Sequence, residues 1–405
     1  MSNNRVSRGR VSARALTLVL GLALVATLGI GAVTVGAGAQ GEPPERLTEA
    51  ELLSRVSAAP DDAPPFRATV AVEQTVVPEG LIGASEGGDT GDSGPRTARV
   101  WRGGPEQLRA ELQGENGDKV VVKNGAEVSV YDGASNTLKV GEKPEAEGPP
   151  EGGLSPEEID EYLAEISPTS NLTTGAPVEF AGRWAYPLTL EPKDRSLTLI
   201  ERAEVLVDAE AFVPLRFELY AEETPEPVAR YEAQDFEVGP VPDRRFEFET
   251  PPGATVERIE PPDGVHADEG REGSEPEAVG SVEEAGELAG FPVEGLAEAP
   301  GGRQLEEIRA ASGGAVLTYG SGWGTVVLAE KTGGDEVPEP QQETGDGREG
   351  GLQLPTVDLG GGVGAREVAT PVGTVLSWSS GGVSYTLAGS VPAAELEAAA
   401  RTLVR

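Results

Sequence analysis

The chain has 405 residues, of which 69 are acidic and 32 are basic, so its formal net charge is −37. A surface of that charge repels phosphate backbones, and we expect no nucleic-acid partner. The sequence contains no cysteine, which excludes disulfides, thiolate zinc sites and lipid-modified cysteines, and its single histidine, His266, excludes a multi-histidine metal centre. The 55 glycines and 33 prolines exclude an all-helical protein.

The first 39 residues have the organisation of a secretion signal. Four arginines come before residue 15, residues 15–35 carry no charge, and small residues follow up to Ala39. The uncharged run is also long enough to span a bilayer, so residues 1–39 are either a signal peptide or an N-terminal membrane anchor. In both cases the remaining chain is extracytoplasmic, either secreted or anchored to the cytoplasmic membrane.

A helix and a strand are predicted next. Thr48 with Glu51 three residues later forms the pattern of a capping box, and apolar residues then recur on one helical face as far as Val56. After a proline-rich stretch, residues 66–74 alternate loosely as a strand. The glycine- and aspartate-rich residues 79–95 are predicted to be a flexible loop.

Residues 119–140 predict an antiparallel meander. Asn124 and Gly125 lie between two β-branched runs, which is the pattern of a two-residue hairpin turn, and residues 132–136 form a second turn. Ser155, Pro156 and Glu158 then predict another capped helix. Further strands are expected over 178–180, 184–190, 197–201, 203–207, 214–220, 229–238 and 246–249.

The pattern divides the exported chain into three parts. Residues 40–258 form a domain with a long antiparallel sheet, and residues 259–280, which contain His266, are an acidic linker too poor in apolar residues to form a core. Residues 281–405 form a smaller α+β domain. It begins with a capped helix at Ser281, continues with short strands at 315–319, 325–328, 374–378 and 383–387, and ends with a helix over 392–404.

Residues 46–258 resemble the LolA-like superfamily of lipoprotein carriers, which also contains MucB/RseB-type regulators. The resemblance depends on the order of several weak motifs, above all residues 205–217 followed by 246–248 and 251–253. It implies an α+β fold with a half-open antiparallel β-barrel capped by helices, whose concave face takes acyl chains. The C-terminal part is similar to a domain of unknown function that is common in Gram-positive envelope proteins.

The strand residues that this reading directs towards an apolar groove are the candidate ligand-binding residues, although each of them could equally be ordinary core. They are Phe66, Val70, Val72, Val120, Val122, Val128, Val130, Leu188, Leu190, Leu206, Phe217, Leu219, Phe246 and Phe248.

The sequence therefore predicts an exported, non-enzymatic, monomeric protein that binds a lipid or an acylated protein. We find no nucleophile with an activating base, so we expect no catalytic residues. Without cysteine, with one histidine and without the spacing of an EF-hand, the sequence predicts no metal site, and we expect no cofactor. The alternative is an envelope-stress sensor that binds a membrane protein partner such as an anti-sigma factor.

Overall fold

The computed structural model describes residues 42–75, 96–114, 117–142, 154–258, 276–332 and 355–404. The predicted secretion segment, the loop 79–95 and His266 lie outside these residues. The described chain forms two compact units. Of the described residues, the first unit contains 42–75, 96–114, 117–142, 154–193 and 201–258, and the second contains 194–200, 276–332 and 355–404.

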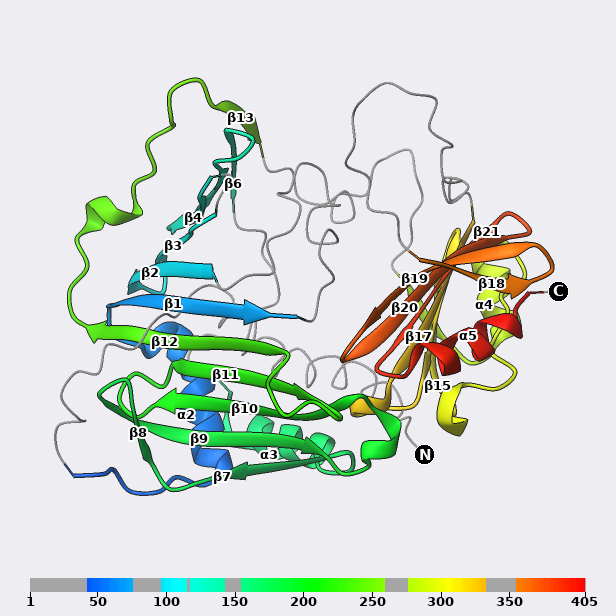
Figure 1. Ribbon diagram of the computed structural model, residues 1–405, viewed down its shortest axis with the longest axis horizontal. Helices are drawn as coiled ribbons and strands as arrows, with labels where there is room; N and C mark the ends of the chain where they lie inside the picture. The colour runs from blue at the N-terminus through cyan, green and yellow to red at the C-terminus, as the bar shows by residue number, and fades with distance from the viewer. Residues whose placement is uncertain are drawn as a thin grey trace, which may run out of the picture. The chain divides into compact units, whose positions relative to one another are not determined.

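The first unit is built on a 13-stranded sheet (Figure 1). Its path runs β13-β6-β5-β4-β3-β2-β1-β12-β11-β10-β9-β7, and β8 pairs with β9 beside this path. The strands are β1 (Phe66–Gln74), β2 (Arg96–Gly104), β3 (Gln107–Leu112), β4 (Lys119–Asn124), β5 (Glu127–Asp132), β6 (Thr137–Glu142), β7 (Ser170–Thr174), β8 (Val178–Phe180), β9 (Arg183–Pro192), β10 (Ile200–Asp208), β11 (Pro214–Ala221), β12 (Ala229–Val238) and β13 (Thr255–Arg258).

The prediction of a wholly antiparallel sheet was wrong at one edge. Strand β13 pairs with β6 in the parallel direction, so the sheet is mixed. A parallel pair needs a long connection, and the chain between β6 and β13 provides it by passing through α3 and strands β7 to β12. Its last part, from Gly239 to Ala254, is visible in Figure 1 as the long green segment between β12 and β13. The two ends of the strand path, β13 and β7, are not paired with each other, so the described strands form no closed barrel.

Both predicted helices of this unit are present, and both begin with the predicted capping box. Helix α2 (Glu49–Asp62) is capped by Thr48 with Glu51, and α3 (Pro156–Ile166) is capped by Ser155 with Glu158. Helix α2 runs six residues beyond Val56, to Asp62. The two helices contact each other, and α2 also contacts β7.

Three local predictions were wrong. The β4–β5 turn consists of Gly125 and Ala126, because Asn124 is already paired with Glu127, and only Gly125 has the positive φ that favours glycine. The predicted strands 197–201 and 203–207 are a short 3₁₀ turn followed by the single strand β10, since the Asp194 side chain accepts a hydrogen bond from the Ser196 N–H and turns the chain.

The predicted strand 246–249 is not a strand. A 3₁₀ turn covers Asp243–Phe246, and the following residues pair with no other strand. Phe246 is nevertheless 1% exposed, because its ring packs against Val120 and Val122. The apolar residues of this segment therefore cover a sheet face without adding a strand to it.

The second unit contains an antiparallel eight-stranded sheet with the order β14-β15-β16-β17-β21-β20-β19-β18. Its elements are β14 (Glu277–Val279), α4 (Val282–Ala289), β15 (Leu305–Ala311), β16 (Gly314–Tyr319), β17 (Val326–Thr332), β18 (Thr356–Gly360), β19 (Val363–Thr370), β20 (Gly373–Ser380), β21 (Val383–Gly389) and α5 (Ala393–Arg401). The protein is therefore α+β, as predicted. Strand β14 lies within the range predicted as linker.

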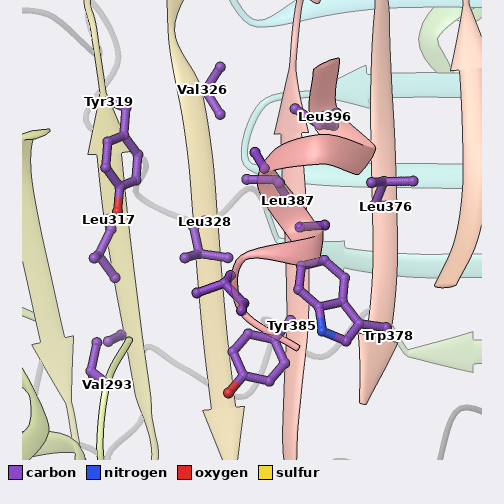
Figure 2. Packing of buried hydrophobic residues seen from close by; sticks show 14 of the residues in the cluster. Val293, Leu317, Tyr319, Val326, Leu328, Leu376, Trp378, Tyr385, Leu387 and Leu396 are labelled. Atoms are coloured by element: carbon purple, nitrogen blue, oxygen red, sulfur yellow. The ribbon is translucent and has the colours of Figure 1, made fainter. Parts of the chain in front are cut away.

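One face of this second sheet carries the core of the unit. Figure 2 shows Leu317, Leu328, Leu376 and Leu387 on neighbouring strands, with Leu396 of α5 close to them. Trp378 is completely buried and stacks on Tyr385, with ring centroids 5.1 Å apart. None of the described helices is long and apolar enough to cross a membrane.

Candidate functional site

The candidate site is one face of strands β1 to β6. Directly paired residues of antiparallel strands point to the same face of a sheet, so the register identifies the residues that share it. Five strands contribute one apolar residue each to a continuous row, which we call the central apolar row. It consists of Ala68, Val100, Ala110, Val121 and Val130.

The central apolar row changes from buried to partly exposed along its length. Val100 and Ala110 are 2% and 8% exposed, whereas Val121 and Val130 are only partly buried. The two neighbouring residues of β3 on this face, Leu108 and Leu112, are also partly exposed. An apolar surface thus continues outward from the core of the unit, and an apolar ligand placed on it would remove more of that surface from water.

Lysines mark the outer end of this face. Lys139 lies directly opposite Val130, and Lys119 and Lys123 lie on either side of Val121 on β4. Each lysine also has an acidic partner. The distances are 3.5 Å from Lys119 to Asp132, 3.1 Å from Lys123 to Glu106 and 3.7 Å from Lys139 to Glu257.

The other end of the face is joined to the C-terminus of α2 by Arg102. Its guanidinium donates hydrogen bonds to the carbonyl oxygens of Ala63 and Pro60, which are left without helical partners at the end of α2. Burial lowers the pKa of Arg102, and the nearby Asp61 opposes this effect. Because Arg102 shares a face with Phe66 and Leu108, it fixes the end of the helix over the apolar face.

The predicted ligand-binding residues do not all share this face. Five of them lie on it, namely Phe66, Val70, Val72, Val128 and Val130. Val120 and Val122 lie on the opposite face, because they pair with Tyr131 and Ser129. Nine of the fourteen candidates are buried, namely Phe66, Val70, Val120, Val122, Leu188, Leu190, Leu206, Phe217 and Phe246.

The remaining candidates lie in three places. Phe246 and Phe248 form a cluster with Val120 and Val122 on that opposite face. Leu206 belongs to the same core cluster as Phe66 and Val70. Leu188 and Leu190 lie opposite Val205 and Ala203, Phe217 lies opposite Tyr231, and Leu219 lies opposite Ala229.

Sequence reasoning missed most of the central apolar row. Val100 and Ala110 belong to strands β2 and β3; the loop 79–95 predicts a strand after it but not its range, and β3 is not among the predicted strands. The signal was present, because Ala98, Val100 and Arg102 alternate with Arg99 and Trp101 at the period of a strand. In the run 120–122, where every residue is valine, alternation could not separate the two faces.

A pocket of about 660 Å³ lies in the second unit, between residues 297–304 and α5. The buried Arg303 lines it, but its guanidinium already donates to the carbonyl oxygens of Pro300, Gly324 and Leu197. This arginine is therefore occupied in holding three chain segments together. Among the described residues, no group of three acidic or histidine side chains could hold a metal ion.

No family model matches the chain, and no curated protein matches it. Solved structures do resemble it. MucB of Pseudomonas aeruginosa, in its complex with MucA, is 14% identical over 87% of this chain and 96% of that chain, with a TM-score of 0.43. A LolA superfamily protein from Nitrosomonas europaea is 12% identical over 50% of this chain and 99% of that chain, with a TM-score of 0.22.

MucB and a LolA superfamily protein are thus among the solved structures to which the chain is similar. At these identities the similarity concerns the fold alone.

Proposed function

We propose that this chain is an exported, non-enzymatic protein of the cell envelope that binds an acyl chain, of a lipid or of a lipoprotein, on the face of β1 to β6. In this proposal the first unit acts as the half-open barrel, with α2 and α3 as its cap. The observation that supports it is the central apolar row, which leaves the core at Ala110 and continues onto partly exposed Val121 and Val130.

The energetics are sufficient for a carrier. Each methylene removed from water contributes ~0.8 kcal/mol, so about ten methylenes would contribute roughly 8 kcal/mol before the cost of ordering the ligand. The lysines at the outer end of the face would lie near the anionic group of a fatty acid or phospholipid. They are Lys119, Lys123 and Lys139.

Binding of a fluorescent fatty acid, 11-(dansylamino)undecanoic acid, tests the proposal. Val130→Gln places a polar amide on the face and should weaken binding about tenfold, which corresponds to ~1.4 kcal/mol. Val140→Gln is the matched control, because Val140 is a partly buried valine on the neighbouring strand, paired with Ser129 on the opposite face. This control should bind like the natural protein.

Two results would contradict the proposal. One is the absence of saturable binding by the natural protein. The other is an equal loss of binding in the two variants. Native mass spectrometry of the protein purified from its own membrane gives an independent check, since a carrier should retain an acyl-bearing ligand. The alternative function, a sensor that binds a membrane protein partner, stays a prediction.

A further inference from the structure

An aromatic ring surrounded by arginines lies on the other face of β1 to β3. Trp101 of β2 is directly opposite Arg67 of β1 and Arg109 of β3, and Arg99 lies two residues before it on the same face. The guanidinium of Arg245 lies over the Trp101 ring, 4.8 Å from its centroid. We call Arg67, Arg99, Trp101, Arg109 and Arg245 the arginine–tryptophan surface.

This surface gathers basic side chains in an acidic chain, with Glu111 and Glu237 on the same face. The whole sequence has 69 acidic and 32 basic residues, yet four arginines gather around one tryptophan. Arg67 pairs with Glu237, and Arg109 pairs with Glu111 at 2.7 Å. Within the described ranges, the exposed Arg99 and Arg245 form no ion pair, although Glu111 lies directly opposite Arg99 and the Arg245 guanidinium lies over the Trp101 ring. Both guanidinium groups can therefore donate hydrogen bonds to a ligand.

Hydrogen bonds and a buried ring hold Arg245 in place on this surface. The Arg109 guanidinium donates hydrogen bonds to the carbonyl oxygens of Arg245, at 3.3 Å, and Glu247, at 3.4 Å. Between these two residues, Phe246 is buried against Val120 and Val122. Because buried neighbours fix the backbone at Arg245, the entropy lost in ordering this residue when a partner binds is small.

We propose that the arginine–tryptophan surface docks an acidic segment of a partner protein. Guanidinium groups bind carboxylates through paired hydrogen bonds, and tryptophan and arginine are the residues that contribute most to protein interfaces. The net charge of −37 opposes the approach of an extended polyanion such as an anionic bilayer, but a short acidic segment meets mainly the local arginines. This inference does not depend on acyl binding, which uses the opposite face of the same strands.

Fluorescence anisotropy with a fluorescein-labelled peptide of alternating glutamate and phenylalanine tests this proposal. The full chain should bind this peptide more tightly than the same peptide with glutamine in place of glutamate, and salt should weaken the binding. The double variant Arg99→Gln/Arg245→Gln should lose at least about tenfold in affinity, since it removes both unpaired guanidinium groups. Both positions are exposed, and the thermal midpoint should stay unchanged.

The double variant Arg46→Gln/Arg401→Gln is the control, because it removes the same charge at exposed arginines outside the surface. Equal losses in the two double variants would overturn the proposal, as would equal affinity for the two peptides. Binding to phosphatidylglycerol vesicles without binding to the glutamate peptide would assign the surface to lipid instead. Self-association that Arg99→Gln/Arg245→Gln abolishes, measured by sedimentation, would assign it to a second copy of the chain.

Discussion

At the scale of single residues, Glu330 is a carboxylic acid buried in the core of the second unit. It lies on the core face of β17, is 1% exposed and has no cationic partner among the described residues. Its two carboxylate oxygens both accept from the Glu294 N–H at 3.1 Å. Burial raises its pKa to about 7. The hydrogen bond from the Glu294 N–H lowers this pKa, and the negative charge of Glu294 raises it further.

This pKa predicts how stability depends on pH. The folded-state pKa is raised above the unfolded value of 4.5, so the protonated acid is favoured in the folded protein. The stabilisation of the folded state by the protonated Glu330 is complete below pH 4.5 and is lost as the pH rises through about 7. The loss in the free energy of unfolding is at most about 3 kcal/mol.

The variant Glu330→Gln keeps an acceptor for the Glu294 N–H and cannot ionise. We expect thermal melts to show the variant near the natural protein at pH 5 and more stable than it at pH 8. Glu306→Gln, at an exposed position of β15, should show no such difference. If the midpoints of Glu330→Gln and the natural protein differed by the same amount at pH 5 and at pH 8, the raised pKa of Glu330 would be contradicted.

At the scale of elements, α2 depends on a side chain that is distant in sequence. The last turn of α2 contains no basic residue, so the negative end of its dipole is not balanced within the helix. Arg102 of β2 supplies both the charge and the hydrogen bonds to Pro60 and Ala63. The helix and the sheet are thereby coupled through one buried guanidinium.

Replacing this arginine should therefore be costly. Arg102→Leu leaves two carbonyl groups without their donors, and we expect a loss of about 2–4 kcal/mol in the free energy of unfolding. Denaturant unfolding followed by circular dichroism measures it. Arg99→Leu, on the same strand but exposed, should change stability by less than about 0.5 kcal/mol. Similar losses in both variants would show that Arg102 has no special part in holding α2.

Elements were predictable where the signal is local. The caps at Thr48 and Ser155 were correct, because a capping box involves only four consecutive residues. The predicted cap at Ser281 is also present, because its side chain accepts a hydrogen bond from the Glu284 N–H. The Glu284 side chain, however, accepts from the Gly280 N–H, one residue before the position that a capping box uses. Residues 246–249 were mistaken for a strand, because apolar alternation also occurs where a loop packs onto a sheet.

At the scale of the whole molecule, the net charge of −37 makes self-repulsion a general cost of folding. Salt shortens the range of this repulsion, from about 30 Å at 0.01 M to about 10 Å at 0.1 M ionic strength. We therefore expect the thermal midpoint to rise over this range, and equally in sodium chloride and potassium chloride. A constant or falling midpoint would show that attractive ion pairs outweigh the repulsion.

The sequence by itself determined the α+β class, the helix caps, most strands and the resemblance to LolA-like proteins, because these follow from local patterns and their order. Only the tertiary structure decided which valines share a face. In residues 120–122 the composition is uniform, and a strand places neighbouring side chains on opposite faces, so the register with β3 and β5 assigns Val121 to the apolar face and Val120 to the other. The arginine–tryptophan surface likewise exists only after three strands and a distant turn come together.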